Sequence, residues 1–240
     1  MLILHAGANE IDYDGLRQLE TPDPTATHVP VPHFRVVDML RHTLGFYGHT
    51  VVSEKHGVTP DGMRYFGLLQ LRSPHTGHVD SVGLRNSHDR SFPIGIGLGA
   101  VTLVCDNLSF LASTVIKRKH TVNARRDLPG LVAEVVEPLT EQREAQARKF
   151  EHYRTTELSD MQSDHCIVQL YKQGVIGVQR IADVLKEYDE PSFDEFRTGP
   201  RNAWRLFNST TFALNGRIAE NPASTARLHQ VIDGVCEHIN

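Results

Sequence analysis

The sequence is poor in cysteine and tryptophan and has no long uninterrupted hydrophobic run. Its three cysteines, Cys105, Cys166 and Cys236, are odd in number and widely spaced. That pattern excludes a secreted disulfide framework and a paired-thiolate zinc module, so we expect reduced thiols. The longest apolar run, 94–105, is broken by glycines and is much shorter than a membrane span. We therefore expect a cytoplasmic protein that does not enter a membrane.

A strong net charge is also lacking. The formal charge is −4 at pH 7 over 240 residues, which excludes a chain-wide attraction to nucleic acid. An apolar fraction of 40% and a charged fraction of 22% are typical of globular proteins and argue against disorder. The charges are unevenly spread, because acidic residues dominate the first 24 positions. Local clusters of cations therefore matter more than the total.

Prolines and glycines divide the N-terminal half. Thr21-Pro-Asp-Pro24 and Pro30-Val-Pro32 disfavour helix and central strand, so we expect an irregular arm over 1–32. Apolar residues at helical spacing then predict a helix over 34–44. The turn sequence Thr59-Pro-Asp-Gly62 predicts a hairpin between strands 49–57 and 63–73. Further strands are expected at 79–84 and 92–104.

After Asn107, apolar residues recur at approximately helical spacing, which predicts helices. A break is expected at Pro138, because proline disfavours helical geometry in the residue before it. The predicted fold class is α+β, with an N-terminal helix and an antiparallel β-meander sheet followed by a mainly helical C-terminal half. The expected parts are an arm (1–32), a sheet core (33–127) and a helical region packed on that core (128–240). The expected helices cover 108–119, 131–158, 159–172, 178–188, 201–217 and 224–239.

A polar motif, Arg85-Asn-Ser-His-Asp-Arg90, interrupts what otherwise reads as buried strand. One interpretation is structural: Asn, Ser and Asp side chains hold turns together through local hydrogen bonds. The other is functional, with Arg85 and Arg90 contacting an anion. Both interpretations stay open at the level of the sequence.

The same motif allows an enzyme hypothesis. The candidate catalytic residues are His88, Asp89 and Asp106, and Cys105 is a candidate nucleophile with His88 as its base. A divalent metal would be the cofactor, and its candidate ligands are His75, His78, His88 and Asp89. Asp106 and Asn107 have a simpler interpretation as the cap of a helix that begins at Leu108. Whether the chain is an enzyme stays open.

A cluster of cations follows the predicted sheet, with no acidic residue between positions 116 and 126. Such a cluster could neutralise a phosphate backbone, although charge runs are also common on solvated surfaces. Together with Arg85 and Arg90 it gives the candidate nucleic-acid-binding residues. The five residues of the cluster are Lys117, Arg118, Lys119, Arg125 and Arg126.

Several segments together resemble the phage/plasmid-like proteins of the domain of unknown function 932 family. The resemblance spans 34–214 and rests on a helix before Gly45 and on three motifs: Val82-Gly-Leu-Arg-Asn-Ser-His-Asp89, Val104-Cys-Asp-Asn107 and Trp204-Arg-Leu-Phe-Asn-Ser-Thr-Thr211. It implies a role in phage or plasmid DNA metabolism and brings no catalytic residues. The order of elements is more distantly similar to Rad52-like single-strand annealing proteins, which implies a homo-oligomer.

Three functions follow as hypotheses. The first is nucleic-acid binding, with single-stranded DNA as the partner. The second is a metal-dependent or phosphate-processing enzyme centred on the Asn-Ser-His-Asp motif. The third is a protein-interaction factor without catalysis.

Overall fold

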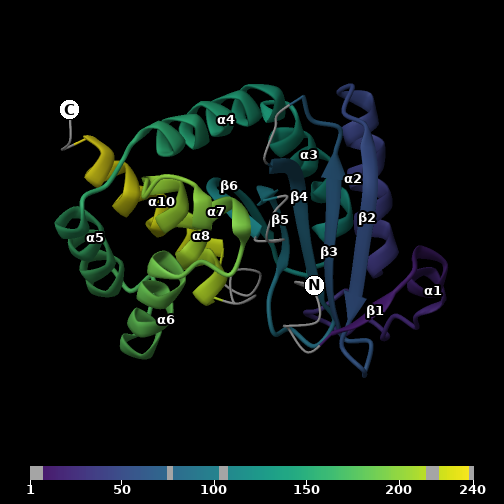
Figure 1. The fold of residues 1–240 in the computed structure, drawn as a ribbon. Coiled ribbons are helices and arrows are strands. Elements are labelled where there is room, and N and C mark those ends of the chain that lie inside the picture. The colour runs from purple at the N-terminus through teal and green to yellow at the C-terminus, as the bar shows by residue number, and fades with distance from the viewer. Residues whose placement is uncertain (1–7, 75–77, 103–107, 215–221, 238–240) are drawn as a thin grey trace.

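The centre of the fold is an antiparallel sheet in which each strand pairs with the next strand along the chain (Figure 1). The computed structural model describes residues 8–74, 78–102, 108–214 and 222–237. The predicted β-meander is confirmed, because the six strands lie in the order β1-β2-β3-β4-β5-β6. The strands are Asn9–Ile11 (β1), Val51–Val58 (β2), Arg64–Leu71 (β3), His78–Ser87 (β4), Ile94–Thr102 (β5) and Leu108–Arg118 (β6).

Helices make up most of the remaining described chain and form two groups (Figure 1). α1 to α3 lie with the sheet, and α4 leads across to the group from α5 to α10 at the left of the view. The helices are Tyr13–Gln18 (α1), His33–Phe46 (α2), Ala124–Val136 (α3), Leu139–Thr155 (α4), Asp160–Lys172 (α5), Val178–Asp189 (α6), Asp194–Thr198 (α7), Ala203–Leu214 (α8) and Pro222–Glu237 (α10). The predicted α+β class is therefore confirmed.

One hydrophobic core lies between the sheet and the pair α2 and α3. Side chains alternate between the faces of a strand, so every second residue of β3 to β5 points toward these helices. Leu69 and Ile96 from the sheet and Leu40 and Val132 from the helices are fully buried there. Burying such aliphatic side chains contributes about 1.5–3 kcal/mol each. This core holds the strand ends in register.

A second core fills the helical half. Phe150 of α4 packs against Trp204 of α8 with ring centroids 4.8 Å apart, and Trp204 stacks on Phe207. Leu68 joins this core from the face of β3 that turns away from α2 and α3. The helical half is therefore packed against the sheet rather than tethered to it.

Local turn chemistry forms as the sequence predicts. The Gly62 N–H donates to the Thr59 carbonyl oxygen over 2.8 Å, and Gly62 has a φ of 69°, which favours glycine. At Pro138 the helical stretch divides into α3 and α4, so the predicted break is confirmed. Ser159 caps α5 through a capping box with Gln162.

The prediction of a helix over 108–119 is wrong, because this segment is the edge strand β6. Its pairing with β5 joins Ile94 to Arg118 and Ile96 to Ile116. A partner strand satisfies backbone groups of β5 that a helix would leave bare, and Thr114, Val115 and Ile116 are β-branched residues that favour strands. The interpretation of Asp106 and Asn107 as the cap of a helix fails with it, because Leu108 begins a strand; both residues themselves lie outside the described residues.

The arm is less irregular than expected, since it contains β1 and α1. The expected boundary after residue 127 passes through α3, whose buried residues belong to the core of the sheet, as does Leu139 at the start of α4. Cys166 and Cys236 are buried and form no disulfide within the described residues, and Cys105 lies outside those residues. None of the helices in the described ranges combines the length and hydropathy that crossing a bilayer requires.

Candidate nucleic-acid interface

The meander brings two separate basic segments to the same end of the sheet, where the strands β4 and β6 finish and β5 begins. β4 ends at Ser87, β5 begins at Ile94 and β6 ends at Arg118. Ile94 pairs with Arg118, so the loop after β4 and the segment after β6 are neighbours. The Arg-Asn-Ser-His-Asp-Arg motif and the basic cluster therefore meet, although 27 positions separate Arg90 from Lys117.

A pocket of about 370 Å³ lies at this end of the sheet. We call it the edge pocket. Its walls are the arm before α2, the loop between β4 and β5, and the segment after β6. The described lining carries two cations, three hydroxyls and two imidazoles, and no carboxylate. The lining residues are Thr27, His28, Arg90, Ser91, Phe92, Pro93, Lys119, His120 and Thr121.

Four buried imidazoles fasten the arm to the sheet, and we call His28, His33, His88 and His120 the histidine clamp. Val31 lies at its centre. The Val31 N–H donates to His120 Nδ1 over 3.0 Å, and the Val31 carbonyl oxygen accepts from His88 Nε2 over 3.0 Å. The same oxygen accepts from Asn86 Nδ2 over 2.8 Å. Each backbone group of Val31 is thus satisfied by a side chain.

These hydrogen bonds fix the protonation of two imidazoles. His120 Nδ1 accepts from Val31, so the proton of the neutral ring is on Nε2. His33 Nε2 lies 3.0 Å from the Gly62 carbonyl oxygen and therefore donates, which leaves Nδ1 to accept from Asn86 Nδ2 over 2.9 Å. A second proton on either ring would place two donors face to face. The clamp therefore requires that the rings of His33 and His120 be neutral.

Burial acts in the same direction as these contacts. It lowers the pKa of His33 to about 3, with a further contribution from His88, whose ring stacks on that of His33 at 3.9 Å. Burial, His28 and His88 together lower the pKa of His120 to about 4. Burial also lowers the pKa of His88. These three imidazoles are uncharged at pH 7 and add no positive charge to the edge pocket.

The predicted cations occupy different environments around the pocket. Arg90 and Lys119 line it, and Lys117 and Arg125 are exposed beside it. Arg118 and Arg126 both pair with Asp127 over 2.5 Å and 2.9 Å, so part of their charge is neutralised. In the described part of the chain, no carboxylate forms an ion pair with the other four cations: Arg90, Lys117, Lys119 and Arg125.

Arg85 lies apart from the exposed cations. Its guanidinium sits 5.3 Å above the Phe92 ring, and burial lowers its pKa. Phe92 also contacts Phe66, with ring centroids 5.4 Å apart. Arg85 therefore supports the aromatic wall of the edge pocket from behind. Arg90 instead adopts a left-handed backbone conformation with a φ of 67° and donates to Thr25 Oγ1 over 3.1 Å.

The candidate catalytic residues His88 and Asp89 have different partners in the fold. His88 points into the clamp, whereas Asp89 pairs with Arg64 over 2.7 Å. Although burial opposes it, hydrogen bonds from Ser91 and the contact with Arg64 lower the pKa of Asp89 to about 2. Ser87 Oγ donates to the Phe92 carbonyl oxygen over 2.7 Å, as the structural interpretation of the motif expects. Asp106 and Cys105 lie outside the described residues.

The candidate metal ligands also lie apart. His78 and His88 are at opposite ends of β4, and His75 lies outside the described residues. His78 is instead beside the fully buried Asp80, which pairs with Arg143 of α4 over 2.7 Å. Across the described ranges, no group of three or more His, Cys, Asp or Glu side chains is arranged to hold a metal ion.

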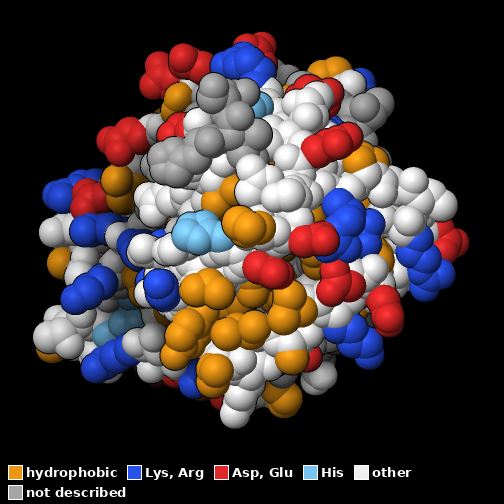
Figure 2. Space-filling view, turned by 60° about the vertical axis from the view of Figure 1, so that its left-hand side comes forward, with side chains coloured by type: hydrophobic (Ala, Val, Ile, Leu, Met, Phe, Trp, Pro, Cys, Tyr) orange, Lys and Arg blue, Asp and Glu red, His pale blue; other side chains and the backbone are white. Residues whose placement is uncertain are grey.

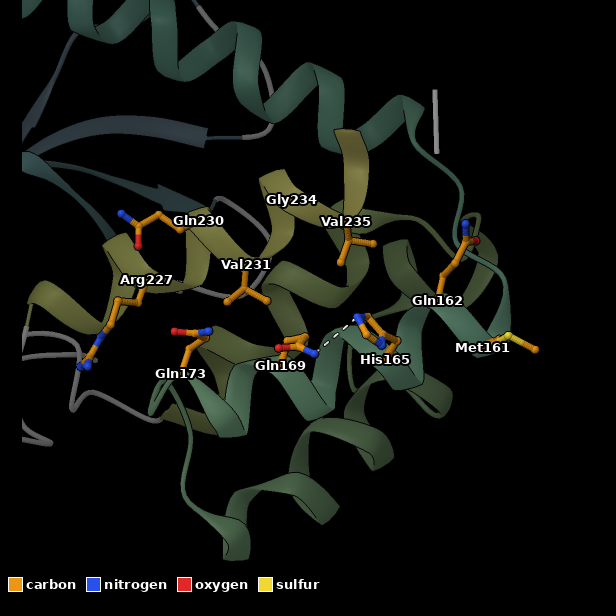
Figure 3. A pocket seen from close by; sticks show the side chains of 10 residues that line it. All are labelled: Met161, Gln162, His165, Gln169, Gln173, Arg227, Gln230, Val231, Gly234 and Val235. Atoms are coloured by element: carbon orange, nitrogen blue, oxygen red, sulfur yellow. Dashed lines mark hydrogen bonds between the residues drawn. The ribbon is translucent and has the colours of Figure 1, made fainter. Parts of the chain in front are cut away.

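A larger pocket of about 660 Å³ lies between α5 and α10, far along the chain from the predicted site residues (Figure 3). Four glutamines and Arg227 give it a mostly neutral, amide-rich wall, and Gln169 Nε2 lies 3.5 Å from His165 Nε2. The side of the molecule that carries the helical half also shows gathered hydrophobic side chains (Figure 2). Exposed apolar residues on α5 and α6 include Met161, Tyr171 and Val178.

Sequence reasoning missed three of the four clamp residues, His28, His33 and His120. The hydrogen-bond partners of their side chains lie 29 to 89 positions away, so no local spacing reveals them. The available signals were the high histidine count of 14 and the positions of His28 and His33 on either side of Pro30-Val31-Pro32.

Comparison with known proteins gives a family and no activity. No curated protein and no solved structure matches the chain. A family model matches residues 25–232, which include the clamp, the edge pocket and most of the helical half. The chain therefore belongs to the family described as Domain of unknown function (DUF932).

Proposed function

We propose that this protein binds single-stranded nucleic acid, and single-stranded DNA in particular, through phosphate contacts at the edge pocket. The observation that carries the proposal is the meeting of the Arg90 loop and the basic segment after β6 around one pocket, whose described lining residues include no carboxylate. Phe92 offers an aromatic surface in the same pocket. Aromatic side chains beside cations are the combination on which unpaired bases stack, which favours a single strand over a duplex.

The charge distribution supports this proposal. Arg90, Lys117, Lys119 and Arg125 are exposed, and their charges are not cancelled by ion pairs with described carboxylates. Since the whole chain is acidic, attraction to a phosphate backbone depends on this local cluster. Binding should therefore weaken steeply as the salt concentration rises.

The proposal extends to a role in phage or plasmid DNA metabolism. That role rests on the resemblance of the sequence to phage- and plasmid-borne proteins. Strand annealing by a homo-oligomer, as in Rad52-like proteins, would be one such activity, and it would require the basic edges of neighbouring subunits to form a continuous groove.

A salt titration of binding to labelled single- and double-stranded oligonucleotides tests the proposal. We expect the single strand to bind more tightly at low salt, with a linear fall of log affinity against log salt. Replacing Lys117 and Lys119 by glutamine should make the slope shallower by about 0.7 for each phosphate that the variant no longer neutralises. Lys186→Gln is the matched control, because Lys186 is an exposed lysine on α6 in the helical half.

Absence of binding to either oligonucleotide at low salt would contradict the proposal. Equal or tighter binding of the duplex would contradict its single-strand part. An unchanged slope in the double variant would move the interface away from the edge pocket.

A further inference from the structure

The edge pocket has a polar part that suits a compact anion. Arg90 enters from the loop between β4 and β5, and Lys119 enters from the segment after β6, so two positive charges come from two walls. The hydroxyls of Thr27, Ser91 and Thr121 complete the lining. Hydrogen bonds from cations and hydroxyls are the usual means by which proteins hold phosphate.

His120 adds a donor that the fold itself leaves without a partner. Its Nδ1 accepts from Val31, so the proton of the neutral ring is on Nε2. The side chain is only 4% exposed, and Nε2 has no hydrogen-bond partner among the described residues. Leaving a buried N–H unpaired costs about 1–3 kcal/mol. Because Nε2 itself has almost no exposed surface, a ligand oxygen in the edge pocket would recover this energy only after a small shift of the neighbouring side chains.

The pocket also has an aromatic wall in a fixed position. Phe66 and the Arg85 guanidinium brace the Phe92 ring, and Pro93 continues the same wall. A ring held in place by its neighbours offers a flat surface at little entropic cost. Stacking of one base on such a ring contributes about 1–3 kcal/mol in single-strand-binding proteins.

We propose that the edge pocket binds one nucleoside monophosphate unit, with its phosphate monoester at Arg90 and Lys119 and its base against Phe92. A phosphate monoester carries about −1.5 to −2 charges at pH 7, whereas a diester within a strand carries one. Two cations therefore favour the monoester. The volume of about 370 Å³ is near the lower end of the usual range for small-ligand sites and suits one nucleotide rather than several.

The monoester has two sources, the phosphorylated end of a strand and a free nucleotide. The strand-end form of the inference rests on the proposed function. The free-nucleotide form does not depend on strand binding, so the two fail separately.

Titration calorimetry compares three pairs of ligands: thymidine monophosphate with thymidine, and a short single strand with or without a phosphate at its 5′ or at its 3′ end. We expect the phosphorylated member of at least one pair to bind roughly tenfold more tightly, the size of one charge-assisted contact. Lys119→Gln and Arg90→Gln should each reduce this preference. Lys117→Gln should weaken both strands alike and keep the preference, because Lys117 is two positions from Lys119 and does not line the pocket.

The outcomes distinguish the two proposals. If no oligonucleotide binds but thymidine monophosphate binds more tightly than thymidine, the proposed function fails and the pocket is a free-nucleotide site. If strands bind but phosphorylation has no effect in any pair, the inference is overturned and the proposed function stands. A preference that survives both Lys119→Gln and Arg90→Gln overturns the inference as well. As a control, Trp204 fluorescence should be the same in each variant as in the wild type if the packed helical core is retained.

Discussion

Acidification from pH 7 to pH 5 should weaken the fold through the histidine clamp. In the folded protein, the pKa is lowered to about 3 for His33 and to about 4 for His120. In the unfolded chain both imidazoles titrate near pH 6.5. The unfolded state therefore binds more protons than the folded state below pH 6.5. Their contribution to stability is fully present above that pH and is lost as the pH falls toward the folded-state pKa values.

The size of the loss follows from proton linkage and hardly depends on how far below pH 5 the folded pKa lies. An imidazole that titrates at about 6.5 in the unfolded chain and stays neutral in the folded protein lowers the free energy of unfolding by about 2 kcal/mol between pH 7 and pH 5. His33 and His120 together account for about 4 kcal/mol. His229, whose pKa burial lowers to about 3, adds a similar loss in the helical core. Such a sum is a large part of the 5–15 kcal/mol that stabilises most domains.

The assay is urea unfolding at pH 7, 6 and 5, followed by far-UV circular dichroism and by Trp204 fluorescence. His120→Asn keeps an acceptor for the Val31 N–H but does not titrate in this range. We expect the variant to be less stable than the wild type at pH 7 and to lose about 2 kcal/mol less on going to pH 5. His42→Asn, an exposed position on α2, should keep the wild-type pH dependence. Parallel pH profiles for wild type and His120→Asn would refute the clamp argument.

Two further predictions concern how the sheet is joined to its neighbours. Arg143→Met should destabilise the fold by about 3–5 kcal/mol in thermal or urea unfolding, because it leaves the buried Asp80 carboxylate without its guanidinium. Arg148→Met breaks only an exposed pair and should cost less than about 1 kcal/mol, and equal costs would contradict the argument. Asn86→Leu removes a donor to the Val31 carbonyl and should cost about 1–3 kcal/mol, with faster proteolysis of the arm as the readout. An arm that stays equally resistant would show that Asn86 does not fasten it.

The parts of the fold that local chemistry decides could be read from the sequence. Gly62 supplies the positive φ that the turn between β2 and β3 needs. Pro138 lies at the predicted break, between the end of α3 and the start of α4. The segment 108–118 could not be read in this way. Its apolar residues fit either a helix or a strand, and the strand is selected by pairing with the open edge of β5, which the local pattern of 108–118 does not reveal.

The candidate site shows the same division between local and distant information. The cations of the basic cluster are visible because they adjoin in the sequence, whereas the return of β6 to the end of β4 is not. The roles of the motif residues also depend on distant partners: His88 contacts Val31 across 57 positions, and Asp89 contacts Arg64 across 25. A histidine beside an aspartate thus looked catalytic when each was engaged elsewhere.

The clamp also explains why histidines, rather than lysines or arginines, hold the arm beside a cationic pocket. Pro30 and Pro32 have no N–H, and the segment between them runs outside the sheet, so Val31 must find both a donor and an acceptor among side chains. A lysine or arginine could donate to its carbonyl oxygen but could not accept from its N–H. A neutral imidazole does either, and it adds no charge that would repel Arg90 or Lys119. The arm that carries Thr27 and His28 into the edge pocket is therefore held by groups that leave the positive charge of that pocket for a ligand.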